Sequence, residues 1–269
     1  MKITFIGGGN MATALIGGLL NKGFAPQDVA VVEPLPEKRQ ALAAQFGVAA
    51  LAEVEKGLES DVIVLAVKPQ QMKEALTPLA GRLTRQIVLS IAAGLPLETL
   101  SRWLSGYRRL VRAMPNTPAL IGAGMAGLYA LPEVALNERM AAERILGAAG
   151  ETLWLENEAM LDAVTAISGS GPAYLFLFVE ALQQAATELG FTPEAARQLA
   201  LATTLGAARL AADSDVPVSL LRERVTSKGG TTAAALAVMA ETGVAAGIVA
   251  GAKAARARGE ELAQQFGAV

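Results

Sequence analysis

Residues 2–12 read K-I-T-F-I-G-G-G-N-M-A, a short apolar strand that runs straight into a glycine cluster. The pattern G-x-G-x-x-A covers Gly7, Gly8, Gly9, Asn10, Met11 and Ala12. In this pattern Gly7 makes the turn, Gly9 lets a pyrophosphate approach the backbone, and Ala12 allows the next helix to pack on the strand. A glycine-rich turn without a ligand is the alternative. The strand before the cluster and the helix after it favour dinucleotide binding.

The rest of the N-terminal half alternates β-branched runs with helix-patterned segments. We expect further strands over 29–33, 61–67, 86–91, 109–114, 125–130 and 152–155, and helices over 10–22, 36–46, 70–79, 97–103 and 133–149. Nearly continuous apolar strands separated by helices predict a mostly parallel sheet that is covered on both faces. This is the α/β plan of the Rossmann type.

From residue 158 onward the sequence pattern is helical. We expect helices over 160–167, 173–189, 193–211, 218–225 and 232–266, the last interrupted near Gly243. The sequence therefore predicts two domains: residues 1–157 form a dinucleotide-binding domain, and residues 158–269 form an all-α domain. The helices over 193–212 and 233–255 are rich in Ala and Gly and more apolar than solvent-facing helices usually are. They predict a homodimer or a higher homo-oligomer.

Composition excludes several classes of protein. The chain has 269 residues, with Lys+Arg 23 against Asp+Glu 25, so a nucleic-acid partner is not expected. With Cys 0 and His 0, neither a disulfide framework nor a metal site is expected. Prolines and glycines interrupt the long apolar stretches, and the N-terminus reaches glycine by residue 7. We expect a cytoplasmic protein without a membrane partner.

Glu33 ends the second predicted strand, where a carboxylate can accept a hydrogen bond from the ribose 2′-OH of NAD(H). The same carboxylate would repel the 2′-phosphate of NADP(H). Lys38 and Arg39 lie one turn into the next helix and could reach a phosphate. The residues themselves favour NAD(H) slightly, and NADPH stays open.

Further candidate residues follow other strands, at the edge of an open α/β sheet where ligands bind. They are Ala66, Val67, Lys68, Pro69, Ala92, Ala93, Gly94 and Asn116. Lys68 could hold negative groups of a cofactor, and the small residues of 92–94 leave room for a flat ring. Asn116 lies between prolines in M-P-N-T-P and offers an amide to a carboxamide such as that of nicotinamide. A helix-starting proline beside a solvated lysine, and an ordinary Asn turn, are the alternatives.

Five motifs in this order resemble those of pyrroline-5-carboxylate reductases: G-G-G-N-M-A, A-V-K-P-Q, M-P-N-T-P, A-I-S-G-S-G-P-A-Y (166–174) and V-T-S-K-G-G-T-T (225–232). The resemblance implies reduction of the C=N bond of 1-pyrroline-5-carboxylate to L-proline with NADPH or NADH. It also implies a Rossmann domain and a helical dimerisation domain. Many members of the family prefer NADPH, and Glu33 departs from their phosphate-friendly pattern.

The segment R-V-T-S-K-G-G-T-T (224–232) then acquires a role as the binding site for a cyclic imino acid. The N–H groups of Gly229 and Gly230 can hold its carboxylate, and Ser227 adds a hydroxyl donor. Thr231 is expected to be the N-cap of the following helix. The family resemblance assigns Thr232 to the ring nitrogen and to proton delivery. An ordinary glycine-containing helix cap is the alternative.

Two other functions remain open. A two-domain reductase of the β-hydroxyacid dehydrogenase type would use a lysine on a helix of the second domain, but 158–212 contains no lysine. A non-catalytic dinucleotide-binding regulator would have no use for T-S-K-G-G-T-T. The turn Ser168–Gly171 is either next to the substrate or a packed hinge between the domains.

Overall fold

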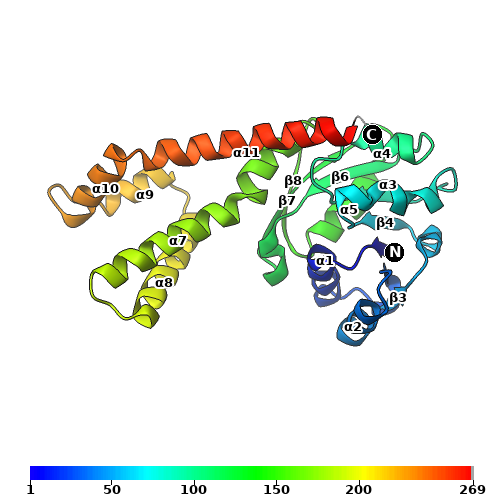
Figure 1. The fold of residues 1–269 in the computed structure, drawn as a ribbon, viewed down its shortest axis with the longest axis horizontal. Coiled ribbons are helices and arrows are strands. Elements are labelled where there is room, and N and C mark those ends of the chain that lie inside the picture. Colours follow the sequence, from blue (N-terminus) through cyan, green and yellow to red (C-terminus); the bar gives the residue numbers. More distant parts are fainter. Residues whose placement is uncertain (268–269) are drawn as a thin grey trace. The chain divides into compact units, whose positions relative to one another are not determined.

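The structure is a computed structural model, and it describes residues 1–267 (Figure 1). The chain divides into two compact units. The first contains residues 1–170 together with the end of the last helix, from Ala254; the second is Gly171–Lys253. The predicted domain boundary at residue 157 remains a prediction, because a compact unit and a sequence domain need not coincide.

The first unit is built on one eight-stranded sheet in the order β3-β2-β1-β4-β5-β6-β7-β8. Its strands are β1 Ile3–Ile6, β2 Val29–Val32, β3 Ala49–Leu51, β4 Val62–Leu65, β5 Ile87–Ser90, β6 Leu110–Met114, β7 Gly124–Ala130 and β8 Gly150–Trp154. Strands β1 to β6 run parallel, and β7 is antiparallel to β6. The order 3-2-1-4-5-6 is that of the Rossmann fold, so the predicted fold class is confirmed.

Helices cover both faces of this sheet. They are α1 Asn10–Asn21, α2 Pro36–Phe46, α3 Pro69–Leu76, α4 Leu97–Trp103, α5 Leu136–Leu146 and α6 Met160–Val164. Short helical turns are η1 Pro26–Asp28, η2 Val54–Glu59, η3 Thr77–Leu79, η4 Thr117–Ile121 and the π-helical η5 Thr165–Gly169. Successive strand residues alternate between the two faces: Val64 belongs to the core under α1, α2 and α5, whereas Leu65 belongs to the core under α3 and α4.

The second unit is helical. It contains α7 Gly171–Glu188, α8 Pro193–Ala212, α9 Val218–Arg224, α10 Thr231–Glu241 and the first part of α11 Val244–Gly267. Helices α7 and α8 pack side by side (Figure 1). The predicted interruption near Gly243 is confirmed, since this residue has φ +73° between α10 and α11. Within residues 1–267, Met160–Glu188 is long and apolar enough to cross a membrane, and α10 with α11 passes that test as a bent pair.

Candidate active site

The glycine loop after β1 has the geometry that the motif predicts. Gly7 has φ +102°, and a Cβ there would lie 2.8 Å from the carbonyl oxygen of Ala66, so only glycine fits. This contact joins the loops after β1 and β4, which are neighbours where the strand order reverses. A Cβ on Gly9 would meet nothing within 4 Å, which leaves open space above the loop for a ligand.

Helix α1 presents its amino end to that space. Its N-cap is Gly9, which has no side chain to cap the helix, and its first turn has no acidic residue. The first bond of the helix runs from the Thr13 N–H to the Gly9 carbonyl oxygen at 2.9 Å. The N–H groups of Asn10, Met11 and Ala12 therefore lack intrahelical partners and are suited to an anion.

Glu33 is buried beneath this loop. Its Oε2 accepts from the Gly8 N–H and its Oε1 accepts from the Leu35 N–H, each at 3.2 Å. Arg39 Nη1 donates to the carbonyl oxygens of Glu33 and Pro34 at 2.8 Å. The end of β2 thus carries a carboxylate that two N–H groups hold in place and a guanidinium that lies over the β2–α2 turn.

A cavity of about 300 Å³ adjoins the glycine loop. Its lining is Ile6, Gly7, Val32, Pro34, Ala52, Val54, Val67, Gln71, Glu74 and Ala75. These residues end or follow β1 and β2, follow β3 and β4, or lie on α3, and most are apolar, as expected of a pocket for an adenosine moiety. Together with the cradle at Gly7 and the open space at Gly9, this lining fits a dinucleotide.

Sequence reasoning missed most of this lining. Val54 follows β3, a three-residue strand that the sequence pattern did not reveal. Of the predicted residues beside it, Val67 lines the cavity, while Lys68 is the N-cap of α3 and Pro69 is its first residue. Pro69 therefore starts a helix, as the alternative interpretation of this segment expected, and Lys68 lies beside it at the edge of the sheet.

The loop after β5 lies further along the same edge. Ala92 and Gly94 are buried and Ala93 is exposed, so Ala93 is the residue of the three that a ligand could touch. Gly94 has φ +69°. The Ala92 N–H donates to Ser90 Oγ at 3.3 Å, which ties the loop to the end of its own strand.

Asn116 is also buried, and both ends of its amide are used within the chain. Its Nδ2 donates to the Ser168 carbonyl oxygen at 3.0 Å, and its Oδ1 accepts from the Met125 N–H at 2.8 Å. A contact with a nicotinamide carboxamide would have to use the remaining hydrogen or lone pair. The side chain thus joins the M-P-N-T-P loop to the S-G-S-G turn, a contact between residues 52 positions apart.

The S-G-S-G turn forms the end of a π-helix over Thr165–Gly169. A Cβ on Gly169 would lie 2.7 Å from the Met114 Cε, so a larger residue here would displace the flexible end of that side chain. The Ser168 hydroxyl donates to the Val164 carbonyl oxygen at 3.1 Å. The first of the two stretches that make up the first compact unit ends at Ser170, immediately after this helix. Such π-helical turns are frequent at functional sites, and no sequence signal pointed to this one.

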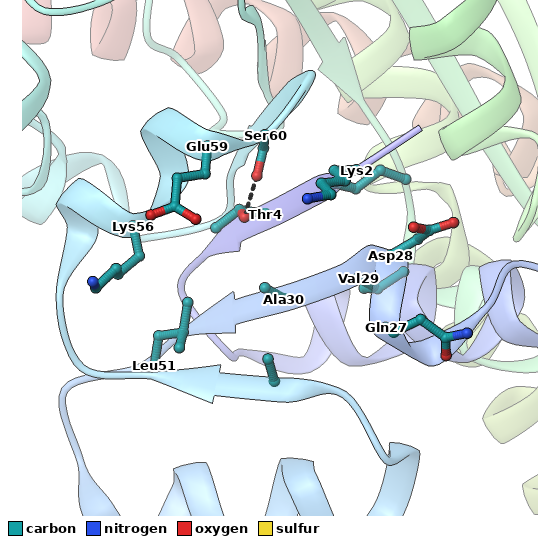
Figure 2. Close-up of a pocket in the computed structure, with 12 residues that line it drawn as sticks. Lys2, Thr4, Gln27, Asp28, Val29, Ala30, Leu51, Lys56, Glu59 and Ser60 are labelled. Carbon is teal, nitrogen blue, oxygen red and sulfur yellow. Dashed lines mark hydrogen bonds between the residues drawn. The ribbon is translucent and has the colours of Figure 1, made fainter.

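A second cavity, of about 370 Å³, lies beside the amino-terminal ends of β1 and β2 (Figure 2). Thr4 and Ser60 are joined there by a hydrogen bond of 2.5 Å between their hydroxyl oxygens. The cavity is also lined by charged side chains of both signs, namely those of Lys2, Asp28, Lys56 and Glu59. Because ligands of open α/β sheets bind beyond the carboxyl ends of the strands, this cavity is on the opposite edge from the dinucleotide site.

In the second unit, the T-S-K-G-G-T-T segment forms a tight turn before α10. The Gly230 N–H donates to the Ser227 carbonyl oxygen at 3.0 Å, and Gly229 has φ +73°. The N-cap of α10 is Gly230, so the expectation that Thr231 is the N-cap was wrong: Thr231 is the first helical residue. No side chain caps α10, and its first N–H groups, including that of Thr232, lack intrahelical partners.

The described part of the chain, residues 1–267, holds no group of three or more acidic side chains that could bind a metal ion. Its chemistry-bearing features are instead the glycine loop at the switch point of the sheet and the open helix end of α10. The fold and the loop together define a dinucleotide-binding protein with a Rossmann domain and a helical domain.

Comparisons with known proteins identify the family. The family model described as "Pyrroline-5-carboxylate reductase dimerisation" matches residues 158–262, and one described as "NADP oxidoreductase coenzyme F420-dependent" matches residues 2–94. A pyrroline-5-carboxylate reductase of Pseudomonas aeruginosa is 44% identical over 99% of this chain and 98% of its own length. The chain belongs to the pyrroline-5-carboxylate reductase family.

Solved structures agree with this assignment. A pyrroline-5-carboxylate reductase from Coxiella burnetii is 40% identical and has a TM-score of 0.91, with 97% of this chain and 98% of that chain covered. A Plasmodium falciparum pyrroline carboxylate reductase with NADP bound is 27% identical and has a TM-score of 0.87, with 98% of each chain covered. The similarity therefore extends over both predicted domains.

Proposed function

We propose that this chain reduces the C=N bond of 1-pyrroline-5-carboxylate to give L-proline, with NADPH or NADH as the electron donor. The observation that carries this proposal is the 44% identity to a named reductase over 99% of the chain. The dinucleotide supplies the hydride when it is bound. The chain itself must bind the two molecules, orient them and assist one proton transfer.

The glycine loop holds the pyrophosphate. The N–H groups at the start of α1 donate to its oxygens, and Gly9 leaves room for it to approach. The cavity beside Gly7 takes the adenosine, and the loop of 92–94 adjoins the nicotinamide. These roles rest on the position of each segment at the carboxyl edge of the sheet.

The start of α10 holds the substrate carboxylate. Its uncapped N–H groups and the positive end of the helix dipole favour an anion, and the exposed Ser227 hydroxyl adds a donor. The Thr232 hydroxyl hydrogen-bonds the ring nitrogen and helps to deliver its proton. The absence of His and Cys is no obstacle, since reduction of an imine needs no covalent nucleophile.

The second unit also forms the subunit interface of a cytoplasmic homodimer. Large apolar side chains are exposed on four of its helices: Phe176, Leu177, Leu205, Leu210, Val238 and Ile248. So much exposed apolar surface is unusual for a folded monomer. The match of residues 158–262 to a dimerisation model supports burial of these side chains between two copies. The same burial accounts for the apolar helix Met160–Glu188 without a membrane.

The test is oxidation of NADPH and of NADH, followed at the nicotinamide absorbance with and without 1-pyrroline-5-carboxylate. Oxidation that depends on the imine, with proline as product, is the expected result. Folded protein that binds either dinucleotide but oxidises neither would favour the regulatory alternative. Turnover of a β-hydroxyacid instead of the imine would favour the dehydrogenase alternative.

A further inference from the structure

The loop between β5 and α4, residues 91–96, is fixed by contacts with other segments of the chain as well as with β5. The Ile91 N–H donates to the Leu65 carbonyl oxygen at 3.1 Å, which fixes the beginning of the loop on β4. Its far end is Leu97, the first residue of α4, whose N–H has no partner within that helix. That N–H is bound by a side chain far away in the sequence.

The side chain is that of Glu158, 61 positions away. Its Oε1 accepts from the Leu97 N–H at 2.8 Å and from Arg112 Nη1 at 2.9 Å. Arg112 is buried in β6, where it is in register with Ser90, the last residue of β5. One carboxylate oxygen thus joins the start of α4 to the strand beside the loop. Hydrogen bonds of this charge-assisted kind are about twice as strong as neutral ones.

The end of α11 supports the same loop from another side. A Cβ on Gly94 would lie 3.3 Å from the Leu262 Cβ and 3.7 Å from the Phe266 Cδ2. Phe266 packs against the buried cluster that includes Ala92 and Leu95. Residues 254–267 belong to the first compact unit, so the loop and its support form one packed body.

We infer that Glu158 is a positioning residue for the 92–94 loop, and that Leu262 forms the second half of the same support. Neither side chain is needed to touch the dinucleotide; both fix the backbone against which the nicotinamide lies. The inference rests on the proposed function, which gives the loop its role. It predicts that the affinity for NADPH depends on residues that are more than 60 positions away from the loop.

The experiment measures the dissociation constant of NADPH by titration calorimetry without substrate, and then the KM for NADPH and for 1-pyrroline-5-carboxylate. Glu158→Ala, which removes the acceptor of both hydrogen bonds, is compared with Glu156→Ala, which removes an exposed carboxylate two positions away. We expect Glu158→Ala to raise the dissociation constant and the KM for NADPH about tenfold and to change the KM for the imine less than twofold. Glu156→Ala should match the unsubstituted protein.

A second pair of variants covers the case in which Glu158→Ala does not fold. Leu262→Ala is compared with Gln265→Ala, an exposed position on the same helix turn. The same selective loss of NADPH affinity is expected for Leu262→Ala alone. Active, folded variants with unchanged NADPH affinity, or with equal losses for both ligands, would overturn the inference. Inactivity of the unsubstituted protein would instead count against the proposed function.

Discussion

The carboxylate of Glu33 accepts a hydrogen bond from the Gly8 N–H, with 3.2 Å between Oε2 and the nitrogen. This bond joins the residue that we propose distinguishes the two dinucleotides to the loop that we propose binds their shared pyrophosphate. A negative charge buried at this point disfavours a 2′-phosphate nearby, whereas Arg39, over the same turn, favours one. We therefore expect the balance between these two side chains to set the cofactor preference.

Glu33→Gln should therefore shift the preference toward NADPH. The amide keeps an acceptor for Gly8 and removes the charge, and we expect the ratio of kcat/KM for NADPH over that for NADH to rise about tenfold, or about 1.4 kcal/mol. Steady-state kinetics with both cofactors measures the ratio. Glu37→Gln, at an exposed position in the first turn of α2, is the control and should leave it unchanged. An unchanged ratio in both variants would show that Glu33 only braces the loop.

Gly7 and Gly9 should respond differently to alanine. At Gly7, φ +102° and the nearby Ala66 carbonyl make a Cβ costly, by about 1–3 kcal/mol, so Gly7→Ala should lower the melting temperature as well as NADPH binding. At Gly9 the backbone is extended, with φ −75°, and the space is open. Gly9→Ala should leave the melting temperature unchanged and weaken NADPH binding. Thermal unfolding and calorimetry separate the two effects, and normal NADPH binding by Gly9→Ala would contradict the pyrophosphate site.

Thr232→Ala should lower kcat about 10²-fold, in the range of a lost proton-transfer group, and Thr232→Ser should restore most of it. The serine hydroxyl can occupy the same place in the first turn of α10. Binding of NADPH should be the same in both variants. A kcat for Thr232→Ala close to that of the unsubstituted protein would remove this residue from the mechanism.

Leu177→Glu should produce a folded monomer. Leu177 is 68% exposed on α7, and a charge at a buried subunit contact is strongly unfavourable. Sedimentation at micromolar concentration measures the change from dimer to monomer. Leu136→Glu, at a position 75% exposed on α5 of the first unit, is the matched control and should remain dimeric. Equal sedimentation of both variants as dimers would move the interface away from α7.

We expect the stability of the folded protein to depend on pH through the carboxyl group of Asp162. Burial raises the pKa of its carboxyl above 3.8, against the opposing effect of Arg112; Glu260, Glu158 and Arg256 also face it. Between 3.8 and the raised pKa, the folded state binds more protons than the unfolded state. The stability contributed by this group therefore declines as pH rises through that window. Asp162→Asn should flatten the curve of melting temperature against pH, while the exposed Asp215→Asn should not.

Residues that start and stop helices made much of the fold predictable. The bounds of α2 were predicted correctly because Pro36 can only begin a helix and Gly47, with φ +68°, ends it. The strand β3 was missed because A-A-L has little β-propensity; its conformation comes from pairing with β2, where Ala49 lies opposite Ala30. The prediction of α5 over 133–149 was three residues too long at each end.

The candidate site also has one part that the sequence predicts and another part that depends on the tertiary fold. The glycine loop was predictable because its chemistry is local to six residues. The bonds of Asn116 were not, since Ser168 becomes its neighbour only through the tertiary fold. The support from Glu158 and Leu262 gave no sequence signal either, because a glutamate before a helix and a leucine within one are ordinary residues at ordinary positions.

The end of α11 has a consequence for how the chain folds during synthesis. The first compact unit is interrupted by Gly171–Lys253, a span of 83 residues, before it receives Leu262 and Phe266. At about 5–20 residues per second, a ribosome needs roughly 4–17 s to make that span. During this interval the Gly94 loop and its apolar neighbours are already outside the ribosome without their cover. The N-terminal part of the nascent chain therefore exposes this apolar surface until translation delivers the helix that covers it.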